Sequence, residues 1–137
     1  MRKSILVMVM AIIAFTVNAQ EKVQAVNNVD GPVIAFSEKA KDFGDITQGE
    51  KVEHTFQLEN KGTAPLVISN VAATCGCTVP AWPKEPIAPG KTAEIKVTFN
   101  SAGKMGKQNS VVRIYSNATE PIEKISMISN VLPKGTK

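Results

Sequence analysis

Thr92-Ala93-Glu94-Ile95-Lys96-Val97-Thr98-Phe99-Asn100 is the stretch of sequence that decides the fold of this chain. Apolar and polar side chains alternate along it, so that one face is apolar and the other is polar. A period of two with polar residues on one face is typical of a half-buried antiparallel strand. The run from Lys51 to Asn60 alternates in the same way. The sequence therefore predicts a core that is built between strands.

Short runs of the same kind fill the chain from Pro32 onward, and glycine, proline and asparagine separate them. About seven strands at a spacing of roughly 8–12 residues are typical of an immunoglobulin-like sandwich. We therefore expect an all-β fold, an immunoglobulin-like β-sandwich of antiparallel strands over residues 32–133, followed by a tail at 134–137. In the turn that follows Asn60, Gly62 is available for a positive φ angle.

The beginning of the chain has the three parts of a secretory signal peptide. Residues 1–3 include two basic side chains, residues 5–15 are mostly apolar, and residues 17–19 end in a small residue. The apolar run is shorter than the about 20 residues that a helix needs to span a bilayer. We therefore expect a cleaved signal peptide over residues 1–19, a flexible lead over residues 20–31, no stable membrane span after cleavage, and a periplasmic or secreted protein.

Charge and motif content exclude several classes of function. Lysines and acidic residues alternate along the chain instead of clustering, so a nucleic-acid-binding groove is not expected. The chain has no glycine-rich phosphate loop, no His-x-x-x-His and no Gly-x-Ser-x-Gly. Its one histidine, His54, shares an apolar strand face with Val52 and Phe56, which favours a packed side chain over a catalytic one. We expect no enzyme activity and no cofactor.

Cys75 and Cys77 are the only cysteines, and they form the centre of Thr74-Cys75-Gly76-Cys77-Thr78. In an exported protein, two cysteines are most simply read as one disulfide. Gly76 would let the backbone bend and bring the Cα atoms within the usual range of about 4.4–6.8 Å. Free or buried thiols are one alternative, and a metal or redox site is another. Two thiolates are half of a zinc site or could hold copper(I), so Cys75 and Cys77 are weak metal-ligand candidates.

Trp82 lies in a proline-rich corner, between Pro80 and Pro83. One interpretation is that its large ring closes one end of the sandwich and is mostly buried. The other is that it is an exposed anchor for a partner, because tryptophan is enriched among the residues that dominate binding energy. Together with Thr74 and Thr78, it is a candidate partner-binding residue.

Four motifs occur in order along the chain: Phe56-x-Leu58-x-Asn60-x-Gly62-x-x-Pro65-Leu66-x-Ile68, Cys75-Gly76-Cys77-Thr78, Pro89-Gly90 and Ser116-Asn117. Together they resemble the bacterial domain-of-unknown-function family 1573, roughly from Phe36 to Leu132. The resemblance implies an immunoglobulin-like sandwich related to Hydin-type and major-sperm-protein-type domains. It also implies a secreted or periplasmic protein of a kind common in Bacteroidetes-type bacteria. It supplies no catalytic residues.

These observations favour an exported, non-enzymatic binding or interaction module. We expect its partner to be a protein, bound for instance by β-strand pairing, or another component of the cell envelope. Sheet edges and the loops of residues 74–90 are the expected contact region. The alternative is a periplasmic copper-handling or thiol-redox protein that uses Cys75 and Cys77.

Overall fold

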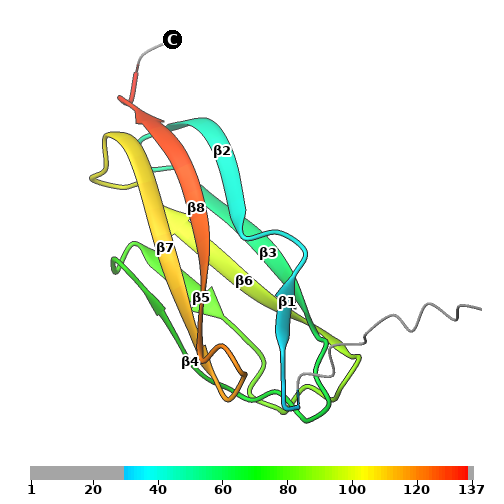
Figure 1. Cartoon of the computed structure of the whole chain (residues 1–137). Helices are drawn as coiled ribbons and strands as arrows, with labels where there is room; N and C mark the ends of the chain where they lie inside the picture. The colour runs from blue at the N-terminus through cyan, green and yellow to red at the C-terminus, as the bar shows by residue number, and fades with distance from the viewer. Residues whose placement is uncertain (1–29, 136–137) are drawn as a thin grey trace, which may run out of the picture.

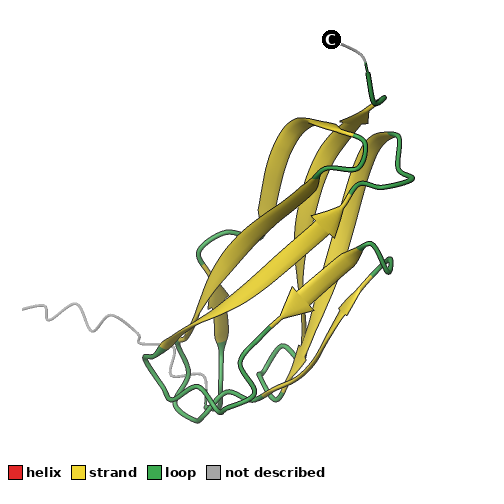
Figure 2. Ribbon diagram, turned by 180° about the vertical axis from the view of Figure 1, so that it is seen from behind, coloured by secondary structure: helices red, strands yellow, loops and turns green. Residues whose placement is uncertain are grey.

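The computed structural model describes residues 30–135, in which the chain forms eight strands and no helix (Figure 2). The predicted signal peptide over residues 1–19 and most of the predicted lead lie outside the described residues. No helix in the described part is long and apolar enough to cross a membrane. The strands are β1 (Ile34–Phe36), β2 (Ala40–Thr47), β3 (Lys51–Asn60), β4 (Ile68–Ala73), β5 (Thr78–Ala81), β6 (Thr92–Asn100), β7 (Gly106–Ser116) and β8 (Ile122–Leu132).

The strands form two four-stranded sheets that pack face to face (Figure 1). Sheet A has the strand order β1-β3-β6-β5, and sheet B has the order β2-β8-β7-β4. The predicted immunoglobulin-like β-sandwich is confirmed, with eight strands where about seven were expected. The described chain enters at one end of the sandwich, beside the end of β3, and leaves at the opposite end, after β8 (Figure 1).

One pair of strands departs from the predicted antiparallel arrangement. β2 pairs with β8 in parallel, with Ala40 opposite Ser126 and Thr47 opposite Leu132. The cause is the short link between β1 and β2, because residues 37–39 carry the chain from sheet A to sheet B without reversing its direction. Alternation determines which face of a strand is buried, but it does not determine the direction of the neighbouring strand.

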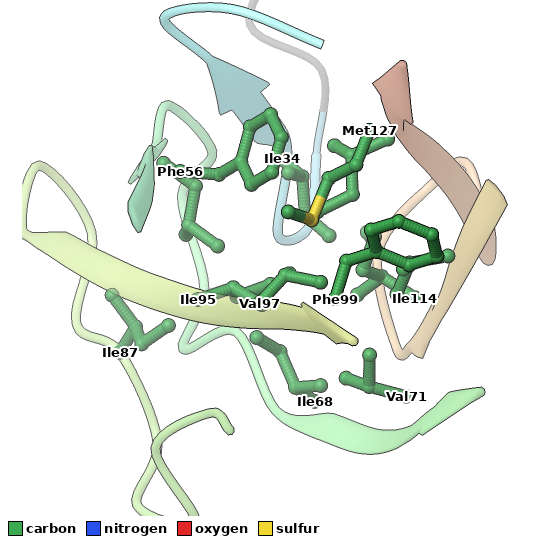
Figure 3. Packing of buried hydrophobic residues seen from close by; sticks show 14 of the residues in the cluster. Ile34, Phe56, Ile68, Val71, Ile87, Ile95, Val97, Phe99, Ile114 and Met127 are labelled. Carbon is green, nitrogen blue, oxygen red and sulfur yellow. The ribbon is translucent and has the colours of Figure 1, made fainter. Parts of the chain in front are cut away.

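Apolar side chains from both sheets fill the space between them (Figure 3). In β6, the predicted inward residues Ile95, Val97 and Phe99 are 0%, 0% and 2% exposed. From the other sheet, Ile114 of β7 and Met127 of β8 are buried against the same cluster. The alternating pattern of the sequence therefore identifies the core face of this strand.

Asn60, the last residue of β3, is fully buried and uses the whole hydrogen-bonding capacity of its side chain. Its Oδ1 accepts hydrogen bonds from the backbone N–H groups of Val33 and Gly62, at 3.2 and 3.0 Å. Its Nδ2 donates to the carbonyl groups of Ala64 and Ile87, at 2.8 and 2.9 Å. One side chain thus joins the segment before β1, the turn after β3 and the loop before β6.

Gly62, two residues later, lies directly against the backbone of residues 31–33. A Cβ atom at this position would collide with the carbonyl oxygen of Gly31 and lie 2.6 Å from the backbone nitrogen of Val33. Gly62 does not use the positive φ angle for which the sequence made it available, since it is not among the glycines with that conformation. Glycine is needed here because another segment of backbone approaches too closely for a side chain.

Replacing Asn60 with alanine should lower the free energy of unfolding by about 3–5 kcal/mol, because each buried polar group left without a partner costs roughly 1–3 kcal/mol. Urea denaturation of the purified protein measures the loss. Asn100→Ala is the matched control, since the Asn100 side chain accepts an exposed hydrogen bond from the backbone of Ala102. It should cost less than about 1 kcal/mol. Equal losses in the two variants would contradict the role of Asn60.

Gly62→Ala should destabilise the protein by about 3 kcal/mol, because the added methyl group forces two backbone segments apart. Gly76→Ala adds the same methyl group where nothing lies within 4 Å. Its effect should stay within about 0.5 kcal/mol. Thermal unfolding of the two variants side by side distinguishes steric exclusion at Gly62 from a general cost of replacing glycine.

Candidate functional site

The turn between β4 and β5 carries the cysteine motif at one lateral edge of the sandwich. Cys75 and Cys77 form a disulfide with their Cα atoms 5.3 Å apart, within the usual range of about 4.4–6.8 Å. The turn is also closed by the backbone, because the N–H of Thr78 donates to the carbonyl of Cys75 at 3.2 Å. The conformation of the turn therefore has support other than the sulfur–sulfur bond.

Both ends of this turn are attached to neighbouring strands. On one side, the N–H of Thr74 donates to the carbonyl of Val111 in β7 at 3.0 Å. On the other side, the carbonyl of Cys77 accepts from the N–H of Asn100 at the end of β6, at 2.8 Å. The two cysteines thus lie between two fixed points, one in each sheet.

Thr78, the first residue of β5, places a buried hydroxyl group next to both sulfur atoms. Its side chain is 4% exposed, and Oγ1 lies 3.7 Å from Sγ of Cys75 and 3.9 Å from Sγ of Cys77. Of the predicted partner-binding residues in this turn, Thr74 is exposed and Thr78 faces the interior. The structure therefore places Thr78 where it can act on the sulfurs rather than on a surface partner.

A shallow groove of about 320 Å³ opens beside Cys77 on the outer face of sheet A. Its lining includes Lys51 at the start of β3, Asn100 at the end of β6, and Val79 of β5. Val79 is 63% exposed, which makes it the most exposed of the large hydrophobic side chains in the described part of the chain. The groove thus brings together one cysteine of the disulfide, an exposed apolar side chain and a cationic residue.

Trp82 lies directly after β5 and has features of both earlier interpretations. Its ring is half-buried and packs against the core. Its indole N–H is buried and has no hydrogen-bond partner among the described residues. The ammonium group of Lys84 lies 3.2 Å from the ring centroid, an arrangement in which the cation is attracted to the aromatic face.

Metal-ligating side chains do not gather around the cysteines. Within residues 30–135, no group of three or more His, Cys, Asp or Glu side chains could hold a metal ion. His54 is half-buried in β3, where it bonds to the Glu38 carboxylate and contacts the Phe56 ring edge-on at 4.8 Å between centroids. Cys75 and Cys77, the weak metal candidates, are joined to each other.

Each sheet also has two edge strands, and three of the four carry features that hinder the addition of another strand. β1 has only 3 residues. β2 has a bulge between Asp42 and Asp45 and carries charged side chains. In β5, the backbone N–H of Asn100 donates a hydrogen bond to the carbonyl of Cys77. Because bonded and unbonded residues alternate in an antiparallel ladder, the backbone polar groups of Thr78 and Pro80 point away from β6. Pro80 has no N–H to offer.

β4 is the exception in its second half: its pairing with β7 shifts register between Ile68 and Asn70 but is continuous from Asn70 to Ala73. Because the N–H of Thr74 bonds to Val111, the alternation of an antiparallel ladder directs the N–H and C=O groups of Val71 and Ala73 away from β7. The strand from Ile68 to Ala73 contains neither proline nor a charged residue. Sequence reasoning missed this edge, because it depends on strand order, which alternation does not encode.

No curated protein sequence matches the chain. The sequence model of a family described as "Protein of unknown function (DUF1573)" matches residues 34–131, as the resemblance of the motifs predicted.

Among solved structures, the chain resembles a protein of unknown function from Porphyromonas gingivalis W83, with a TM-score of 0.65 and 18% identity over 77% of this chain and 50% of that chain. It also resembles PapD-like domain 7 of human CEP192, with a TM-score of 0.59 and 11% identity over 73% of this chain and 85% of that domain. The YadV chaperone matches with a TM-score of 0.52 and 17% identity over 76% of this chain and 53% of that chain. The chain therefore spans about half of the Porphyromonas gingivalis protein. At these identities, the likeness shows the fold.

Removing the disulfide with Cys75→Ser and Cys77→Ser together should lower the free energy of unfolding by no more than about 2 kcal/mol, because the closed loop is very short. Urea denaturation of the oxidised protein and of the double variant measures the difference. The unsubstituted protein unfolded in the presence of a reductant should match the double variant. A loss of about 4 kcal/mol or more, the range of bridges that close long loops, would contradict this expectation.

Proposed function

The chain belongs to the DUF1573 family, and on that premise we propose that it is an exported, non-enzymatic binding module. Its partner is an extended segment of another protein, which adds as a further strand to the β4 edge of sheet B. The observation that carries this proposal is the unprotected edge of β4, on which Val71 and Ala73 direct their backbone groups outward. An exposed row of backbone donors and acceptors is a template for a strand from another chain.

The spacing on β4 suits an incoming strand. Val71 and Ala73 are two residues apart, which is the repeat at which an extended backbone presents its hydrogen-bonding groups to one side. Their side chains face inward, with Val71 6% exposed. A partner strand can therefore bond to both residues without displacing any part of the core.

The outer face of sheet B indicates the chemistry of the partner. Ala72 lies directly opposite Arg113 of β7, and Arg113 is exposed. The methyl group of Ala72 is too small to separate the guanidinium group from the sheet edge. An aspartate or glutamate beside Ala72 in the added strand could pair with this arginine, since arginine suits carboxylates. The proposed partner segment is therefore extended and carries an acidic residue at this position.

The fold and the disulfide support the remaining parts of the proposal. The likeness to the PapD-like domain and to the YadV chaperone places the chain among immunoglobulin-like sandwiches, many of which serve in protein–protein interaction. Disulfides persist in oxidising compartments, which supports a periplasmic or cell-surface location.

A photoreactive amino acid at position 72 tests the proposal in intact cells, since it lies on the edge beside the proposed strand. We expect a discrete covalent adduct with another protein. Ala73→Pro, made in the same background, removes the outward N–H of β4 without removing a bond to β7, and it should reduce the adduct at least about tenfold. Ala40→Pro is the matched control on the β2 edge. There the backbone N–H of Ser126 donates to the carbonyl of Lys39, which implies that the backbone N–H of Ala40 also points away from its neighbouring strand.

Three outcomes would overturn this function. The adduct could survive Ala73→Pro, it could be lost equally in Ala40→Pro, or it could join two copies of this chain. Circular dichroism of each proline variant shows whether the sandwich has formed. Hydrogen exchange on the purified complex supplies a second measurement, because an added strand should slow exchange at the amides of Val71 and Ala73.

A further inference from the structure

The disulfide is placed where an external thiol can reach it. Cys77 lines the groove on the outer face of sheet A, and Gly76 beside it is exposed and has no side chain to cover the sulfurs. Both cysteines are half-buried; Cys77 packs in part against the core and also lines the groove, whereas Cys75 does not line it. Thiol exchange requires access to one particular sulfur, and the groove provides access to Cys77.

The turn that holds the cysteines is bonded independently of them. The Thr78–Cys75 backbone bond closes the turn, and the bonds of Thr74 and Cys77 to β7 and β6 fix its two ends. Breaking the sulfur–sulfur bond therefore leaves the two thiols close together on an intact sandwich. A cysteine pair held in this way can be oxidised again without refolding of the chain.

Two features of the site favour a thiolate. The buried hydroxyl of Thr78 lies within hydrogen-bonding distance of both sulfur atoms, at 3.7 and 3.9 Å. Lys51, a cationic residue, lines the same groove as Cys77. Hydrogen-bond donors and nearby cations stabilise thiolates, and a stabilised thiolate is the better leaving group.

From this arrangement we propose that the Cys75–Cys77 pair is a thiol–disulfide exchange site whose substrate is a cysteine pair of another polypeptide. This activity is separate from strand binding at β4 and does not depend on it.

The exchange proceeds in two successive thiol–disulfide exchange steps. A substrate thiolate attacks Sγ of Cys77, a substrate–Cys77 disulfide forms, the bond to Cys75 breaks, and its electron pair leaves on Sγ of Cys75 beside the Thr78 hydroxyl. The second substrate thiolate then attacks the substrate sulfur of the mixed disulfide and releases Cys77 as a thiolate. The substrate dithiol is oxidised by two electrons to a disulfide, and Cys75 and Cys77 take up two protons as thiols.

The assignment of Cys77 as the attacked sulfur is tested with single-cysteine variants. Cys75→Ser retains Cys77, and Cys77→Ser retains Cys75. With oxidised glutathione as the probe, Cys77 should form the mixed disulfide roughly tenfold faster than Cys75, because it lines the groove. The unsubstituted protein gives the same information without substitution, when its reaction with reduced glutathione is quenched in acid and the modified cysteine is located by mass spectrometry.

The role of Thr78 is tested with a matched pair of substitutions. Thr78→Val removes the hydroxyl but keeps the shape of the side chain, and it should slow reduction by dithiothreitol about three- to tenfold. Thr78→Ser keeps the hydroxyl and should react within about twofold of the original rate. Circular dichroism of the reduced, unsubstituted protein should match that of the oxidised form.

Any of four results would overturn the proposal. They are equal or faster reaction at Cys75, an unchanged rate in Thr78→Val, loss of the sandwich on reduction, and exchange that begins only after denaturant is added.

Discussion

The buried side chain of Asn60 is the interaction on which the rest of this sandwich depends. A buried amide is costly unless all of its groups have partners, and Asn60 finds them in the adjacent turn and in two segments 27 residues away on either side. The backbone of Asn60 adds two more bonds to the same loop, to Lys91 and Gly90, at 2.9 and 2.7 Å. The same arrangement brings the backbone of residues 31–33 against Gly62, where a side chain would not fit. It secures the end of the sandwich at which the described chain enters.

The fold could be predicted from the sequence as far as single strands determine it. Alternation in Lys51–Asn60 and Thr92–Asn100 identifies inward and outward faces, because these faces follow from the geometry of an extended chain. The parallel pairing of β2 with β8 could not be predicted in this way, because it depends on a three-dimensional crossing at residues 37–39. Gly62 was singled out for the wrong reason, since a close approach by distant backbone leaves no local signal in the sequence.

The candidate sites show the same limit. The motif around Cys75 and Cys77 stands out in the sequence because it holds the only two cysteines of the chain. Thr78 is buried although Thr74 is exposed, and this difference depends on where β5 begins. Local patterns could not predict that Lys51 lines the same groove as Cys77, nor that the edge of β4 is open. Both follow from the order of strands in the sheets.

The described chain enters at the end of the sandwich where Val33 bonds to Asn60, and it leaves after β8 at the opposite end (Figure 1). Its two termini therefore lie along the long axis and not side by side. If this sandwich stood between two other domains of a longer polypeptide, those domains would lie at opposite ends of this axis, and the three would form a rod. In such an array both lateral edges of the sandwich would stay clear of the joints. The β4 edge and the disulfide turn would then repeat along the side of the rod at the spacing of the domains.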